Sequence, residues 1–133
     1  MIALLIVAHG NLGDSLIQCA THVLGQRPEA LDNVDLSACA DPAEMLERAR
    51  ASLAAVDRGD GVLILTDVYG ATPCNTVCKI LHAERVEAVA GVNLPMLLKA
   101  LTYREQGMAV LLEKAVAGGR TGIFSINPES ACA

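Results

Sequence analysis

Short runs of apolar residues alternate along this chain with longer segments in which apolar residues recur every three or four positions. The longest runs are apolar almost throughout, which is typical of strands buried on both faces, and they span Ile2–Ala8, Gly61–Thr66 and Val86–Ala90. A weaker run at Asn33–Leu36 predicts one more strand. Helical spacing predicts helices over Asp14–Leu24, Asp41–Val56, Thr72–Leu81, Leu94–Tyr103 and Met108–Ala117.

Capping residues mark the ends of several of these helices. Gly25 follows the first helix and Gly118-Gly119 follows the last, as glycines commonly do at helix C-termini. In the stretch Asp41–Glu44, the Asp suits the N-cap, the Pro suits the first turn, and the Glu is placed to complete a capping box. Thr72-Pro73 predicts another helix start, because Thr suits the N-cap and Pro suits the first turn. A short final strand is predicted at Thr121–Ile126.

This alternation of strands and helices predicts a single α/β domain. Successive β–α units favour a mainly parallel sheet of about four strands, joined by right-handed crossovers and covered by helices on both faces. The predicted domain spans residues 1–126, and residues 127–133 form a short C-terminal tail. In such open sheets, ligands bind at the carboxyl ends of the strands, near the point where the strand order reverses.

Composition narrows the classes of function. The 133 residues are 53% hydrophobic and only 2% aromatic, so the core is expected to consist of Ala, Val, Leu and Ile. A formal net charge of −5 and the scarcity of aromatic side chains argue against nucleic-acid binding. No apolar run reaches the length of a membrane span, and the opening run lacks a basic leader. We therefore expect a cytoplasmic protein that is not embedded in a membrane.

The cysteines predict no disulfide framework. There are five, an odd number with irregular spacing. Cys74 and Cys78 are four residues apart and share one face of the predicted helix. The two thiols could therefore form a metal-binding or redox-active pair. The interpretation as small buried apolar side chains is favoured, because free cysteine is among the most buried residue types. A cysteine-dependent activity of Cys74, in the first turn of its helix, also stays open.

The candidate chemistry lies in loops that follow the strands. His9-Gly10 follows the first strand, and Asp67 follows the third. If these strands are neighbours, as in a flavodoxin-like order, His9 and Asp67 face each other. A carboxylate on one ring nitrogen fixes the imidazole tautomer and leaves the lone pair of the other nitrogen free to attack. It also stabilises the cationic ring that phosphorylation creates.

The segment Gly70–Thr72 adds groups that suit an anion. The Thr72 hydroxyl and the free N–H groups at the start of the helix could bind phosphoryl oxygens, and Gly70 lets the backbone approach closely. Each residue also has a simpler interpretation: His9 as a polar loop residue, Asp67 as a turn or cap, Thr72 as a helix start. Their coincidence at strand ends favours a functional site, but spacing alone does not name a reaction.

Other polar residues have plainer roles. His22 falls within a predicted helix and His82 near a helix C-terminus, where a histidine interacts favourably with the helix dipole. We interpret both as structural or surface residues. Gly91 and Asn93 follow the fourth strand, and Asn93 is either a loop residue before the next helix or part of the site.

Three of these loops together resemble a known family. Ile6-Val7-Ala8-His9-Gly10 resembles the opening of enzyme IIA domains of the mannose family in the bacterial phosphoenolpyruvate-dependent phosphotransferase system (PTS). The segment from Leu65 to Asn75 resembles the second motif of that family, in which a strand-end Asp precedes a Gly-rich loop and a Ser-Pro or Thr-Pro helix start. The segment from Ala90 to Leu97 matches the third motif, and the resemblance covers residues 2–126.

The resemblance implies a role for each matching residue. His9 corresponds to the phosphorylated histidine, Asp67 to the carboxylate that orients its ring, and Thr72 to a hydroxyl beside the phosphoryl group. Gly10, Gly70, Ala71 and Asn93 correspond to loop positions that surround it. The resemblance implies a phosphotransferase with a phosphohistidine intermediate, which requires no metal or other cofactor.

The resemblance also implies partners. In this family the phosphoryl donor is the phosphocarrier protein HPr and the acceptor is a histidine of a IIB protein or domain, here expected on another chain. Members form homodimers that exchange a C-terminal strand, which would be Thr121–Ile126 here. The family often has Gly-Gly-Ser where this chain has Gly70-Ala71-Thr72, so the geometry around the phosphoryl group is expected to differ slightly.

Three alternatives stay open at this point. The chain could be an orphan regulatory phosphoprotein that signals its phosphorylation state. It could supply phosphoryl groups to dihydroxyacetone kinase, as a variant of the same family does. It could also be a tetrapyrrole chelatase, a class that likewise begins with an apolar strand and His-Gly. A chelatase needs further ligands in the same cleft, and neither His22 nor His82 follows a strand.

Overall fold

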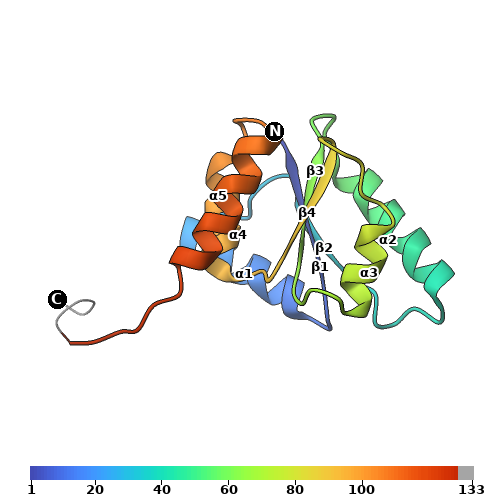
Figure 1. The fold of residues 1–133 in the computed structure, drawn as a ribbon, viewed down its shortest axis with the longest axis horizontal. Coiled ribbons are helices and arrows are strands. Elements are labelled where there is room, and N and C mark those ends of the chain that lie inside the picture. The colour runs from blue at the N-terminus through green and yellow to red at the C-terminus, as the bar shows by residue number, and fades with distance from the viewer. Residues whose placement is uncertain (129–133) are drawn as a thin grey trace.

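The computed structural model describes residues 1–128, and these form one four-stranded parallel sheet covered by helices on both faces (Figure 1). The strand order is β2-β1-β3-β4. The strands are β1 (Ala3–Ala8), β2 (Leu31–Asp35), β3 (Val62–Thr66) and β4 (Val86–Ala90). The helices are α1 (Leu12–Leu24), α2 (Pro42–Val56), α3 (Thr72–Cys78), α4 (Leu94–Tyr103) and α5 (Met108–Thr121). The predicted α/β fold class is confirmed.

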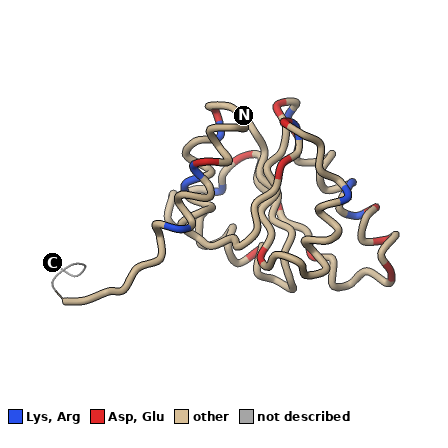
Figure 2. Tube along the Cα trace, viewed as in Figure 1, with Lys and Arg blue, Asp and Glu red and all other residues tan. Residues whose placement is uncertain are grey.

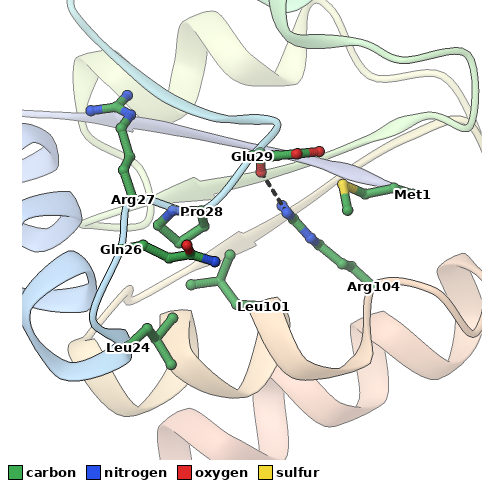
Figure 3. A pocket seen from close by; sticks show the side chains of 8 residues that line it. All are labelled: Met1, Leu24, Gln26, Arg27, Pro28, Glu29, Leu101 and Arg104. Atoms are coloured by element: carbon green, nitrogen blue, oxygen red, sulfur yellow. Dashed lines mark hydrogen bonds between the residues drawn. The ribbon is translucent and has the colours of Figure 1, made fainter.

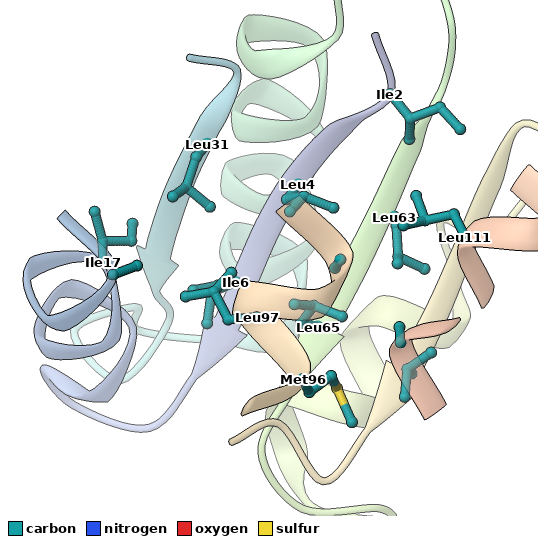
Figure 4. Close-up of a cluster of buried hydrophobic side chains, with 14 of the residues drawn as sticks. Ile2, Leu4, Ile6, Ile17, Leu31, Leu63, Leu65, Met96, Leu97 and Leu111 are labelled. Atoms are coloured by element: carbon teal, nitrogen blue, oxygen red, sulfur yellow. The ribbon is translucent and has the colours of Figure 1, made fainter. Parts of the chain in front are cut away.

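Alternate residues of the buried strands point into two separate cores. On one face, Leu4 and Ile6 of β1 pack with Leu63 and Leu65 of β3 against α1, α4 and α5 (Figure 4). On the other face, residues such as Leu5 of β1 pack against α2 and α3. Every residue of β1 and β3 is buried, which explains why these strands read as unbroken apolar runs.

Several predicted helix ends are confirmed. Gly25 ends α1 in the left-handed conformation, with φ of 84°. Asp41 caps α2, accepting a hydrogen bond from the Glu44 N–H at 2.8 Å, while the Glu44 carboxylate accepts one from the Ala40 N–H at 2.7 Å. The bounds predicted for α4 and β4 match the structure.

Other predicted bounds were wrong. The second strand begins at Leu31 rather than Asn33, because buried Leu31 pairs with Leu4 of β1. Helix α1 begins two residues before the predicted Asp14. Helix α3 ends at Cys78 rather than near Leu81, because the chain tightens into a turn and His82 then pairs with Val86 at the start of β4.

The two glycines predicted to end the last helix instead lie inside it. Helix α5 runs through Gly118 and Gly119 as far as Thr121. A Cβ atom at Gly118 would lie 2.6 Å from the Lys99 Cβ, and one at Gly119 would lie 2.8 Å from the Met96 Cε. These glycines therefore let α5 pack closely on α4, and they do not stop the helix.

The final strand predicted at Thr121–Ile126 is absent from the described chain. Thr121 is the last residue of α5, and residues 122–128 form no strand. In Figure 1 this segment leaves the end of α5 and runs away from the body. Residues 129–133, most of the predicted tail 127–133, lie outside the described residues. No helix within residues 1–128 is long and apolar enough to cross a bilayer.

A buried arginine fixes the end of the sheet at which β1 begins. Arg104, which follows α4, is only 5% exposed. Its guanidinium donates hydrogen bonds to the carbonyl oxygens of Ala30 at 3.2 Å and Glu29 at 2.5 Å, across a cavity of about 490 Å³ (Figure 3). Burial lowers the pKa of this guanidinium. The contacts hold the turn before β2 against α4, and this cavity lies at the other end of β1 from His9.

Candidate functional site

His9 and Asp67 lie side by side because β1 and β3 are neighbours in the sheet. Each residue directly follows its strand, at the edge where the parallel strands end. The Nδ1 atom of His9 lies 2.6 Å from the Asp67 Oδ2, and the backbone N–H of His9 donates to the same oxygen at 3.0 Å. The Val68 N–H donates to the other carboxylate oxygen at 2.9 Å. The structure therefore brings together the pair predicted from the sequence.

The two side chains of this pair differ in exposure. The Asp67 side chain is 10% exposed, whereas that of His9 is 58% exposed. Burial acts most strongly on the pKa of Asp67 and raises it, but hydrogen bonds from the backbone and ring of His9 and from the Val68 N–H together lower that pKa below its usual value. The carboxylate is therefore ionised at neutral pH and held by the chain around it.

This geometry selects one tautomer of the imidazole. An ionised carboxylate only accepts hydrogen bonds, so the Nδ1 atom of His9 must carry the proton that lies between it and Asp67. The lone pair of the neutral ring is then on Nε2. The arrangement can supply a nucleophilic nitrogen and stabilise the positive charge that the ring gains when this nitrogen is substituted.

A cavity of about 230 Å³ adjoins His9 on the side of α2 and α3. Two of its lining residues carry hydroxyl groups: Thr72, predicted from the sequence, and Ser37, which was missed. The rest of the lining is mainly apolar and comes from Ala8, Leu36, Met45 and Pro73. Ser37 lies two residues beyond β2, the other neighbour of β1, and a flavodoxin-like strand order, had it been assumed, would have indicated it.

The loops around the site depend on glycine at two points. Gly10, after His9, has φ of 54°, and Gly70, before the start of α3, has φ of 84°. Both values lie in the left-handed region, which other residues rarely adopt. Ala71 has φ of −76°, an ordinary value, so its methyl group fits this backbone. The N-cap of α3 is Ala71, and Thr72, predicted as the cap, is the first residue of the helix.

Asn93 lies apart from the cavity beside His9. Its side chain accepts a hydrogen bond from the Met96 N–H at 2.9 Å and donates one to the Gly119 carbonyl at 3.1 Å. Both polar groups of the side chain are thus occupied in capping α4 and joining it to α5. Of the two interpretations of Asn93, the structure supports that of a helix start.

Among residues 1–128, the other histidines and the cysteines do not line the cavity beside His9. His22 lies in the last turn of α1, and His82 lies beyond the end of α3. Both Cys74 and Cys78 are free thiols; Cys74 is buried as interpreted, but the same interpretation was wrong for Cys78, which is exposed at the end of α3. Within residues 1–128, no group of three or more His, Cys, Asp or Glu side chains could hold a metal ion.

Acidic side chains surround the end of the sheet that carries His9. In Figure 2, red acidic positions and no blue basic positions lie directly beneath the strands. Asp67 follows β3, Asp35 ends β2 and Asp14 lies in the first turn of α1. Within residues 1–128, no lysine or arginine lines the cavity beside His9, although the charge of Arg48 acts on Asp35.

Comparisons with known proteins find relatives that match most of this chain. The family model EIIA-man, described as "PTS system fructose IIA component", matches residues 3–116. The PTS system mannose-specific EIIAB component of Escherichia coli (strain K12) is 34% identical over 128 residues, which cover 94% of this chain and 39% of that protein. This chain thus spans well under half the length of that relative.

Two further proteins resemble this chain over most of its length. The PTS system fructose-specific EIIA component of Bacillus subtilis (strain 168) is 29% identical over 106 residues, covering 79% of this chain and 72% of that protein. The mannose/sorbose specific IIA subunit from Enterococcus faecalis has the same fold, with a TM-score of 0.84 and 19% identity over 98% of both chains.

Proposed function

The chain belongs to the mannose family of enzyme IIA components (EIIA-man) of the PTS, and from this premise we propose that it is a phosphocarrier that accepts a phosphoryl group on Nε2 of His9 and passes it on. The observation that supports this most strongly is the 2.6 Å contact between the His9 Nδ1 and the Asp67 carboxylate. The carrier would act in sugar uptake or in its regulation, as a phosphotransferase with a phosphohistidine intermediate.

The proposed transfer moves one phosphoryl group between two imidazole rings. The lone pair of the His9 Nε2 attacks phosphorus in line as the N–P bond to the donor histidine breaks, and the donor ring leaves with that electron pair. The Nδ1 proton stays between His9 and Asp67. Asp67 balances the positive charge of the ring as it forms, so catalysis consists of positioning and electrostatic stabilisation. Passing the group to the acceptor reverses these steps.

We propose that the Thr72 hydroxyl binds a phosphoryl oxygen, whereas the Ser37 hydroxyl donates its hydrogen bond to Asp35. Both line the cavity that adjoins His9, and they come from opposite sides of it, on α3 and beyond β2. A neutral donor such as the Thr72 hydroxyl suits a group that must be held briefly and then released. The apolar remainder of the cavity, from Leu36, Met45 and Pro73, would keep water from one side of the phosphoryl group.

Removal of the Thr72 hydroxyl is expected to slow transfer. Thr72→Ala should lower the rate of phosphoryl transfer from HPr about tenfold, because one hydrogen bond that strengthens in the transition state is lost. Thr72→Ser keeps the hydroxyl and should stay within about twofold of the original rate. Quenched-flow measurement of the transfer rate checks both values, and equal rates for the Ala and Ser variants would contradict the role of the hydroxyl.

We propose HPr as the donor and a histidine of a IIB protein or domain as the acceptor. The surface beside His9 suits a protein partner, because the loop that follows β3 exposes Val68 by 56% and Tyr69 by 84%. Exposed aromatic side chains are common anchors in protein interfaces. The acidic residues around the site would attract a partner with a basic surface.

We also propose that two copies exchange their C-terminal segments. Within the described chain β4 is an edge strand, with β3 on one side only. The segment after α5 exposes three apolar side chains, Ile123, Phe124 and Ile126, each by more than two thirds (73%, 69% and 69%). Paired with the β4 edge of a second copy, these side chains would be covered and the edge would be closed.

Light scattering tests the proposed dimer. The protein is expected to have the mass of two chains at micromolar concentration. A variant with Ser in place of Ile123, Phe124 and Ile126 should have the mass of one, because the apolar surface that drives exchange is lost. A monomer for the unaltered protein, or a dimer for the variant, would contradict strand exchange.

Intact-mass analysis tests the phosphocarrier function itself. The protein is mixed with phosphoenolpyruvate, enzyme I and HPr. The expected result is a gain of one phosphoryl group, which is lost in acid and appears only when HPr is present. No gain for a folded protein beside active HPr would overturn the proposal.

A further inference from the structure

Asp35 lies at the same end of the sheet as His9, on the side opposite Asp67. It is the last residue of β2, and it is paired with Ala8, the last residue of β1. Because β1 lies between β2 and β3, His9 has the strand that ends in Asp35 on one side and the strand that precedes Asp67 on the other. No role for Asp35 follows from the transfer chemistry described above.

The chain around Asp35 holds its side chain in place. The Ser37 N–H donates a hydrogen bond to the Asp35 Oδ1 at 2.9 Å. Hydrogen bonds from the Ser37 hydroxyl and N–H are the strongest influences on the pKa of Asp35 and lower it, and the nearby charges of Arg48 and His9 lower it further. Asp35 is thus a fixed negative charge at neutral pH that interacts electrostatically with His9.

The Asp35 carboxylate contacts a residue that lines the cavity in which the phosphoryl group would lie. Ser37, which holds Asp35, lines the cavity beside His9. Asp67 already occupies the Nδ1 atom of the ring, so Asp35 acts on His9 through space and not through a hydrogen bond to that nitrogen. A phosphoryl group carries close to two negative charges at neutral pH, so a phosphoryl group on the His9 ring adds negative charge beside the strand that ends in Asp35.

We propose that Asp35 is a positioning residue that sets the phosphoryl-transfer potential of His9: its fixed negative charge disfavours phospho-His9 and so makes that form a ready donor. The inference rests on the proposed function. A carrier must release its group as readily as it accepts it. A carboxylate that repels the phosphoryl group, together with the neutral Thr72 hydroxyl that binds it, keeps this balance near even.

The test is the equilibrium constant for phosphoryl exchange between phospho-HPr and this protein. Asp35→Asn removes the charge and keeps an acceptor for the Ser37 N–H. It is expected to shift the equilibrium toward phospho-His9 by about threefold to tenfold at low salt. The difference from the unaltered protein should shrink as salt is raised, because added ions screen the repulsion. Intact-mass analysis of both proteins at equilibrium gives the constant.

Matched variants separate charge from structure. Asp32→Asn makes the same change on an exposed residue of β2, about 10 Å from Asp35, and is expected to leave the constant within twofold. Asp35→Glu keeps the charge and should also stay near the original value. If Asp35→Asn fails to fold by circular dichroism, Asp35→Ser provides the neutral side chain.

Two outcomes overturn the proposal, and they differ in what else they overturn. If the unaltered protein is phosphorylated but the neutral variant has the same or a lower constant, only the role of Asp35 fails. If the unaltered protein takes no phosphoryl group from HPr, the proposed function fails with it. A salt-independent increase in the constant would also contradict an electrostatic role.

Discussion

Replacement of His9 by alanine is expected to reduce phosphoryl uptake from HPr by at least ~10⁴-fold, to below detection. The Nε2 atom of His9 is the attacking atom in the proposed transfer, so no neighbouring group can replace it. The ring is 58% exposed, and its loss leaves the His9 and Val68 N–H groups to hold Asp67. The variant should therefore fold normally, and intact-mass analysis with a thermal melt checks both expectations.

The other two histidines provide matched controls for this loss. His22 lies in the last turn of α1, and His82 lies beyond α3, so neither shares the cavity beside His9. His22→Ala and His82→Ala should take up one phosphoryl group like the unaltered protein. Phosphoryl uptake by His9→Ala, or loss of uptake in one of the two control variants, would show that His9 is not the phosphorylated residue.

Replacement of Asp67 by alanine is expected to slow transfer by about 10² to 10³ without preventing folding. Two effects add. The ring loses the acceptor that fixes the proton on Nδ1, so part of the population presents the wrong tautomer. The positive charge that forms on the ring also loses its neighbouring carboxylate. Quenched-flow transfer from phospho-HPr measures the rate, and an unchanged rate would remove Asp67 from the mechanism.

Asp67→Asn distinguishes these two effects. The amide oxygen can still accept the Nδ1 proton, so the tautomer is retained while the charge is lost. We expect a rate between those of the unaltered protein and Asp67→Ala. A rate equal to that of Asp67→Ala would assign the whole effect to charge. Asp32→Ala, on the exposed part of β2, controls for the removal of a carboxylate.

The sequence predicted the pair at the centre of the site because two strong local patterns combined with a topological rule. Unbroken apolar runs identified β1 and β3, and the residues after them were His9 and Asp67. In a flavodoxin-like order these strands would be neighbours, and the observed order β2-β1-β3-β4 meets that condition. The contact across 58 positions of sequence follows from those two facts.

Ser37 and Asp35 were missed because β2 is the weakest strand in sequence. Only Leu31 and Val34 of its five residues are buried, so its polar residues and those just beyond its end did not stand out in the sequence. Their significance comes from the register between β1 and β2, which depends on packing of the whole sheet. Such pairings cannot be read from the local pattern.

The errors at the C-terminal end have a similar cause. Gly118 and Gly119 resemble a helix stop, yet they lie where α5 packs closely on α4 and a side chain would collide. Local sequence does not distinguish a glycine that ends a helix from one that lets two helices approach. The segment predicted as a strand, Thr121–Ile126, has the apolar composition of one but no neighbouring strand within the described chain.

The most direct test of the account is nuclear magnetic resonance of the histidine rings after phosphorylation through HPr. Protein labelled with ¹⁵N at histidine reports which ring and which nitrogen carries phosphorus. The account predicts that only His9 changes, that phosphorus is bonded to Nε2, and that Nδ1 keeps its proton beside Asp67. Phosphorus on Nδ1 of His9, on His22 or His82, or on no histidine would contradict it.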